Sequence, residues 1–156
     1  LDILLDAFSH LRGRHDVALV VAGEHYEDKK AYDAQIARLG LDDSVHMVDR
    51  YIPNEDVAGL FDLAAACVLP YRHATGSGVA NIARARGTRL VLSDLHGLRE
   101  TLNDEGIFWF SPGDAGALAE VLRDVLQTPA QTVATGDSGW ESVVEAVTSP
   151  LRSATR

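Results

Sequence analysis

Cysteine, basic residues and long apolar runs are scarce in this sequence, and each scarcity excludes a class of protein. The 156 residues include one cysteine, Cys67, which cannot form an intrachain disulfide and lies in an apolar run, as a buried structural thiol would. The six histidines are scattered, without the Cys and His spacing of a metal site. No apolar run approaches the roughly 18 residues that span a bilayer, and no signal-peptide pattern is present. We therefore expect a cytoplasmic protein.

Acidic residues outnumber basic ones by 23 to 14, which gives a formal net charge of −9. Such a balance argues against a broad surface for nucleic acid or for an anionic membrane. This charge balance does not exclude a single phosphate-binding site, because backbone N–H groups bind anions without a positive side chain. With 46% hydrophobic residues and the length of one ordinary domain, the chain has enough apolar material for a sizeable core.

Apolar runs bounded by glycine or polar residues alternate with stretches in helical periodicity. The first stretch has apolar residues at 1, 4, 5, 8 and 11, and Asn54 is a candidate N-cap for a later helix. The pattern predicts helices at 1–11, 27–40, 55–65 and 113–127, a helix that begins near Ser77, a short turn or helix at 97–102, and strands at 17–23, 44–52, 66–70, 88–93 and 106–110. This order predicts an α/β fold, a doubly wound parallel sheet with helices on both faces in three layers.

We expect residues 1–127 to form one domain and residues 128–156 to form a polar loop and a C-terminal helix. That helix has Trp140, Val143, Val144 and Val147 on one face. We expect it to pack back on this domain or on an N-terminal domain absent from the sequence. The chain opens in helical periodicity without an initiator methionine, so we interpret it as part of a longer protein in which a strand precedes residue 1.

The stretch 71–79, YRHATGSGV, follows a predicted strand and opens a predicted helix. Ligands of open parallel sheets bind beyond the carboxyl ends of the strands. Gly76 and Gly78 would let the backbone approach a ligand there, and the free N–H groups and dipole of the helix start suit a phosphate or pyrophosphate. Side-chain donors flank the glycines: Thr75, Ser77 and the bidentate Arg72. The alternative is an ordinary helix start, capped by Ser77 or Thr75 after a tight turn.

Four stretches read together resemble the C-terminal half of nucleotide-sugar glycosyltransferases of the GT-B architecture, in the group 1 family, also called family 4. They are VALVVAGEHYED (17–28), LGLDDSVHMVDRYIPNEDVAGLFDLAAACVLPYRHATGSGV (39–79), GTRLVLSDLHGLRETL (87–102) and GIFWFSPGDAGALAEVLRDVL (106–126). The likeness covers about residues 1–127 in register. It implies a Rossmann-like domain that binds a sugar linked to a nucleoside diphosphate.

The resemblance also implies which residues meet this donor, a UDP-, GDP- or ADP-sugar. The donor-phosphate set is Arg72, Thr75, Gly76, Ser77, Gly78 and Val79. The base and cleft set is Gly23, Glu24, Arg50, Tyr51 and Ile52. Three histidines fall near the edge of the predicted cleft: His25, His73 and His96. For Glu24 and the histidines the alternative is an exposed side chain without a ligand, and for Tyr51 it is plain packing.

The sequence departs from the family pattern at the donor loop and its helix. Many members carry two glutamates there, and the matching positions fall near Ala74 and Ile82, neither of which is acidic. The second glutamate accepts hydrogen bonds from the ribose diol, which Ile82 cannot do. A subset of the family has an Ala-Thr-x-Ser-Gly-Val loop, and ATGSGV (74–79) fits that subset. Arginines also stand where the family is usually apolar or proline: Arg84, Arg86 and Arg89.

The resemblance implies sugar transfer with retention of configuration, without a metal or other cofactor. The acceptor, a sugar, a lipid or a small molecule, would bind the absent N-terminal domain, which would also make any peripheral membrane contact. We expect no nucleic-acid partner, and we expect this chain alone to bind donor weakly and to transfer nothing. Two alternatives stay open: a catalytically degenerate lobe that serves in interaction or assembly, and an unrelated doubly wound domain for another phosphate ligand.

Overall fold

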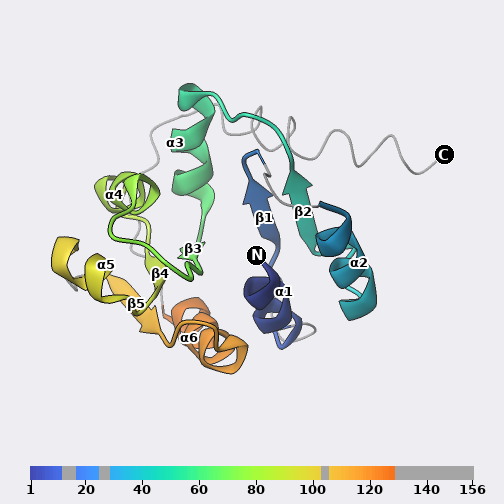
Figure 1. The fold of residues 1–156 in the computed structure, drawn as a ribbon. Helices are drawn as coiled ribbons and strands as arrows, with labels where there is room; N and C mark the ends of the chain where they lie inside the picture. Colours follow the sequence, from blue (N-terminus) through green and yellow to red (C-terminus); the bar gives the residue numbers. More distant parts are fainter. Residues whose placement is uncertain (12–16, 25–28, 103–105, 129–156) are drawn as a thin grey trace.

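The computed structural model describes residues 1–11, 17–24, 29–102 and 106–128. Helices and strands alternate along this part of the chain (Figure 1). The helices are α1 (Asp2–Ser9), α2 (Lys29–Leu39), α3 (Asn54–Leu63), α4 (Gly78–Ala85), α5 (His96–Thr101) and α6 (Ala115–Gln127). The strands are β1 (Leu19–Ala22), β2 (Val45–Val48), β3 (Cys67–Leu69), β4 (Leu90–Ser93) and β5 (Ile107–Phe110). The predicted order is confirmed, and the predicted C-terminal helix and His25 lie outside the described residues.

All strand pairs are parallel, and their hydrogen bonds divide the strands into two sheets. Strand β1 pairs with β2, with Ala22 opposite Val48, and β4 lies between β3 and β5. The predicted α/β fold with parallel strands and covering helices is confirmed, with the difference that its strands form two hydrogen-bonded groups. Among the described helices, none is both long and apolar enough to cross a membrane.

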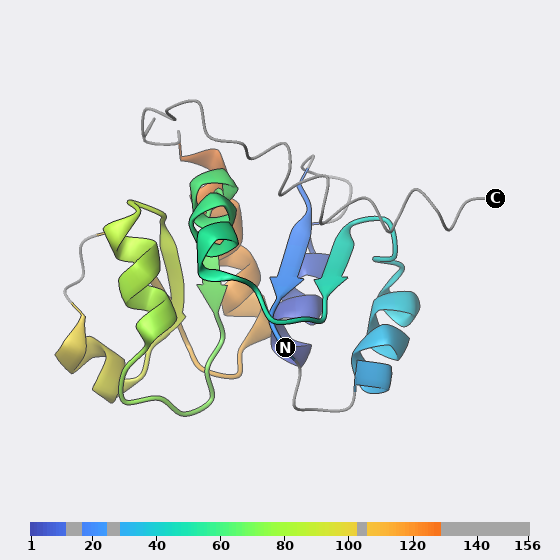
Figure 2. The same ribbon diagram turned by 90° about the horizontal axis from the view of Figure 1, so that it is seen from above.

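Strand β4 alternates its side chains between two apolar clusters, one on each face of its sheet. Leu90 and Leu92 pack with Ala83 of α4 and Leu98 of α5. Val91 joins the cluster on the opposite face, where α6 lies. All five side chains are fully buried. Figure 2 shows α4 and α6 on opposite sides of this sheet, so the three predicted layers are present here.

Helices α1 and α6 pack against each other and form the larger cluster. Leu5 of α1 and Leu118 and Val125 of α6 are fully buried, and the spacing of Leu118 and Val125 places both on one face of α6. The same cluster takes Val45 from β2 and Phe110 from β5. It therefore connects the two sheets through side chains.

Local sequence signals explain where several helices begin and end. Gly40 (φ +62°) and Gly87 (φ +73°) adopt the left-handed conformation that ends α2 and α4. The predicted N-cap at Asn54 is wrong: Pro53 occupies the cap position of α3 in an extended conformation, and no side chain caps this helix. The rigid φ of proline fits the residue just outside the helix, which makes exposed Asn54 the first helical residue.

The short helix α5 is fixed to its surroundings by one arginine. The Arg99 guanidinium carbon lies 4.4 Å from the centre of the Trp109 ring on β5. The same guanidinium donates to both carboxylate oxygens of Asp94, at 2.7 and 3.0 Å. Leu98 beside it is fully buried, so α5 has both an apolar and a cationic attachment to the sheet.

Candidate functional site

The carboxyl ends of β1, β2 and β3 lie at one edge of the molecule, together with the loops after β2 and β3 and the starts of α1 and α4 (Figure 2). These three strands point the same way in that view. The carboxyl edge of parallel strands is where α/β folds bind their ligands. Both predicted sets of donor residues lie on loops of this edge.

Helix α4 begins as the sequence predicts, with Ser77 as its N-cap. The Ser77 backbone is extended, and its Oγ accepts a hydrogen bond from the Ala80 N–H at 3.1 Å. The first intrahelical acceptor is the Ser77 carbonyl, which takes the Asn81 N–H at 3.2 Å. The N–H groups of Gly78 and Val79 precede that bond and have no acceptor within the helix. They are donors that an anion at the helix start would satisfy.

The loop before α4 is closed on itself by two hydroxyl groups. Tyr71 Oη lies 3.0 Å from Ser77 Oγ, so the residue that follows β3 is tied to the cap of the next helix. Both side chains are half-buried, whereas the residues between them include exposed Thr75 and Gly76. The loop is thus anchored at its two ends and open to solvent in its middle.

The protein's own packing does not require glycine at Gly76 or Gly78. Neither has a positive φ, and a Cβ built on either would meet nothing within 4 Å. Both are exposed. Space above a helix start is what a ligand that approaches the backbone closely needs.

Gly97 lies beneath the same loop, and there the reason for glycine is internal packing. A Cβ at Gly97 would lie 2.8 Å from the Thr75 Cα and 3.0 Å from the Ala74 carbonyl oxygen. The backbone of 74–75 therefore rests directly on the first turn of α5. The sequence pattern predicts a short turn or helix at 97–102 but does not identify this contact.

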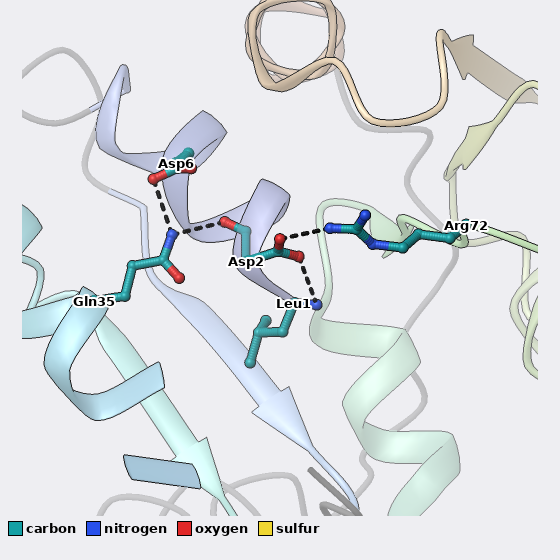
Figure 3. A network of polar contacts seen from close by, with 5 residues as sticks. All are labelled: Leu1, Asp2, Asp6, Gln35 and Arg72. Carbon is teal, nitrogen blue, oxygen red and sulfur yellow. Dashed lines mark hydrogen bonds and ion pairs between the residues drawn. The ribbon is translucent and has the colours of Figure 1, made fainter. Parts of the chain in front are cut away.

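Arg72, predicted to meet a phosphate, pairs with Asp2 at the start of α1 (Figure 3). Its Nη2 lies 2.6 Å from Asp2 Oδ2, a contact between residues 70 positions apart. The adjacent Gln35 of α2 donates to the Asp2 carbonyl and to the Asp6 carboxylate, both at 2.9 Å. This network draws α1, α2 and the loop after β3 together.

The partners of Asp2 favour the ionised form of its carboxyl group. Partial burial acts to raise its pKa, whereas the Ile3 N–H and the Arg72 guanidinium act to lower it, and the pKa lies below its usual value. Asp2 is therefore an anion throughout the neutral range, and Arg72 has a charged partner there.

The second predicted set lies after β1 and β2. The Gly23 N–H donates to the Val48 carbonyl at 3.1 Å, and Gly23 has a φ of +132° that favours glycine. Tyr51 is 63% exposed, and Arg50 donates to its carbonyl at 3.4 Å. Glu24 is exposed and Ile52 half-buried. Among the described residues, no hydrogen bond or ion pair joins this set to the loop 71–79.

The remaining residues singled out from the sequence divide by their contacts. Ile82, near which many family members are expected from the resemblance to carry a glutamate, is 45% exposed on α4. Arg86 forms an ion pair with Asp62, and Arg89 donates to the carbonyls of Val125 and Thr128, both at 3.0 Å. These two arginines thus have structural partners. His73 is exposed, and His96 lies 3.2 Å from Glu100.

Fold and loop together define a Rossmann-like α/β domain with an open helix start at its carboxyl edge. The sequence profile described as glycosyl transferases group 1 matches residues 1–128, and the chain belongs to that family. The family resemblance inferred from the four sequence stretches is confirmed.

Relatives agree with this assignment. The chain is 31% identical over 144 residues to an MMP alpha-(1->4)-mannosyltransferase from Mycolicibacterium hassiacum, covering 91% of this chain and 34% of that protein. The structure of this chain is similar to that of sucrose-phosphate synthase from Thermosynechococcus elongatus, with a TM-score of 0.72 and 25% identity. The similarity covers 98% of this chain and 40% of the synthase. The fold also matches Anabaena HepE in complex with UDP, with a TM-score of 0.68, 20% identity, and 97% and 44% covered. The chain therefore spans about a third of the curated relative that it matches.

Proposed function

We propose that this chain is the donor-binding half of a retaining glycosyltransferase, which transfers a sugar from a nucleoside diphosphate to an acceptor. One observation carries the proposal: helix α4 opens at the carboxyl edge with the Gly78 and Val79 N–H groups beyond its first internal bond. The fold leaves open space over both neighbouring glycines. Family membership supports a nucleotide sugar as the ligand, and HepE, of the same fold, has been solved with UDP.

The proposed site would act on the leaving group. Breaking the bond between sugar and phosphate builds negative charge on the diphosphate, and preorganised donors that meet this charge lower the barrier. Removing one such donor typically costs about 3 kcal/mol of transition-state stabilisation. The α4 amides are one donor set, and Arg72 is a charged group on the same loop. We propose that no metal takes part, that Tyr51 and its neighbours after β2 meet the base, and that the acceptor binds another domain.

A degenerate, non-catalytic lobe is the second candidate, and Ile82 is the observation that favours it. Ile82 is exposed, and the resemblance places it near the position where many family members present a carboxylate to the ribose. A donor held without that contact would rely on its diphosphate and base. If those contacts are too weak, the lobe binds no nucleotide sugar, whereas the donor-binding half of a transferase binds one.

The test is calorimetric titration of the intact protein with UDP-, GDP- and ADP-sugars. One of them is expected to bind and to raise the melting temperature as its concentration increases. The absence of binding with all three would favour the degenerate lobe.

Charge variants at Ser77 then locate the site. Ser77→Asn and Ser77→Asp both preserve a capping side chain, but only Asp adds a negative charge at the helix start. We expect Asn to keep most of the affinity and Asp to weaken donor binding by about tenfold or more. Equal affinities of the two variants would contradict a phosphate at this helix start.

A further inference from the structure

Arg72 makes its ion pair with Asp2 across the edge where the donor is proposed to bind. The contact between Arg72 Nη2 and Asp2 Oδ2 is short, at 2.6 Å, yet both side chains are exposed, by 64% and 49%. Exposed pairs of this kind contribute little stability, so they exchange partners easily. Figure 3 shows the Arg72 side chain extended toward the start of α1.

The position of Arg72 in the chain keeps it within reach of the start of α4. Its neighbour Tyr71 is tied to Ser77 by the 3.0 Å hydroxyl contact, and Arg72 belongs to the same short loop that leads into the α4 cap. A guanidinium presents five N–H donors on a long flexible stem. The Arg72 side chain can therefore pair either with the Asp2 carboxylate or with an anion at the start of α4.

The surroundings of Asp2 make its carboxylate the group that holds Arg72. Gln35 donates to the Asp2 carbonyl rather than to its carboxylate. One turn further along α1, Asp6 accepts from Gln35 and lies 3.8 Å from Arg38, with a similar exposed fraction of 46%. Asp6 is therefore a carboxylate on the same helix that engages other partners, which makes it a matched control.

We propose that Asp2 competes with the donor diphosphate for Arg72 and so sets the affinity of the site. In the empty protein, Asp2 holds the guanidinium; when a nucleoside diphosphate occupies the start of α4, its greater negative charge takes Arg72 over. This inference rests on the proposed function, since it assumes a diphosphate at α4. Asp2 is a positioning residue that acts through Arg72.

Calorimetry with UDP, GDP and ADP on the intact protein tests the competition. Asp2→Asn is expected to bind the preferred nucleotide about two- to fivefold more tightly, the range that an exposed ion pair allows. Asp6→Asn should stay within about twofold of the wild type, because Asp6 makes no contact with Arg72. Arg72→Gln should weaken binding, and in that background Asp2→Asn should change nothing.

The outcomes separate the inference from the function on which it rests. If Asp2→Asn binds like the wild type or more weakly, the competition is refuted, while nucleotide binding by the wild type leaves the proposed function in place. A gain that persists in the Arg72→Gln background would show simple loss of negative charge and would also refute it. Failure of the wild type to bind any nucleotide would overturn the proposed function itself.

Discussion

Cys67 on β3 is the chain's single thiol, and burial raises its pKa from 9.0 to about 11. Since the thiolate is the reactive form, we expect the native protein at pH 8 to react with a thiol reagent about a hundredfold more slowly than the unfolded chain. A chromogenic disulfide reagent, with and without urea, measures both rates. Cys67 is half-buried, so the expected buried thiol is only partly realised; a native rate equal to the unfolded rate would contradict even this partial burial.

The same pKa shift predicts a loss of stability in alkali. The unfolded chain loses its thiol proton near pH 9, before the folded protein does, so the stabilisation is complete below pH 9 and declines as the pH rises toward 11. Urea unfolding of the wild type and of Cys67→Ala over this range isolates the contribution. The difference between the two should shrink with rising pH.

Single side chains were predictable where the signal is local. Ser77 caps α4 because a small hydroxyl residue precedes a helical stretch, and the sequence alone indicates this. Asn54 is also of a residue type that caps helices, but the rigid Pro53 occupies the cap position of α3. The pair of Arg72 with Asp2 joins residues 70 positions apart, so it follows from packing that no local pattern encodes.

Helix α5 supports the donor loop through Gly97, and this support can be tested by adding one methyl group. In Gly97→Ala, the new Cβ would meet the backbone of Thr75 at 2.8 Å. The helical preference for alanine over glycine favours the change by up to about 1 kcal/mol, but forced overpacking costs about 1–3 kcal/mol. We expect net destabilisation in urea unfolding, together with faster hydrogen exchange of amides 74–80.

Gly116→Ala provides the matched control for that change. Its Cβ would lie 3.2 Å from Asp114 Oδ1, the oxygen that caps α6 by accepting from the Ala117 N–H at 2.9 Å, so any effect arises at the start of α6 and not at the donor loop. The control is expected to lose no more than about 1 kcal/mol of stability through its cap, and it should leave hydrogen exchange of amides 74–80 unchanged. Unchanged exchange at 74–80 in Gly97→Ala would show that the loop does not rest on α5.

The sequence pattern predicts elements better than their pairing. Alternation of apolar runs and amphipathic stretches gives the helices and strands in their correct order, because each run must bury its apolar face. The strands are shorter than the runs, for instance Val45–Val48 within 44–52, since the final residues bend into loops. The pairing of the strands into two groups joins residues far apart in the chain, and no periodicity encodes it.

At the scale of the whole molecule, one apolar cluster holds the two sheets together. Leu5 of α1 is fully buried in it, and Leu5→Ala should reduce the free energy of unfolding by about 2–5 kcal/mol. Because the cluster reaches β2 and β5, the loss should affect both sheets in a single unfolding transition. Circular dichroism in urea, with hydrogen exchange of each strand, measures this.

Leu63→Ala is the control, since this leucine is 43% exposed and its truncation should cost about 1 kcal/mol or less. Two separate transitions in Leu5→Ala, or a loss confined to β1 and β2, would mean that the sheets are not coupled through this core.

The stacking of Arg99 on Trp109 provides the molecule with a built-in optical reporter. Arg99 belongs to α5, two residues beyond Gly97, and its guanidinium covers an indole ring on β5. Any shift of α5 moves a positive charge across a fluorophore, so the emission wavelength of that indole follows the helix beneath the loop. The sequence has two tryptophans, and Trp140→Phe would leave Trp109 as the sole emitter, through which nucleotide titrations could be followed without a label.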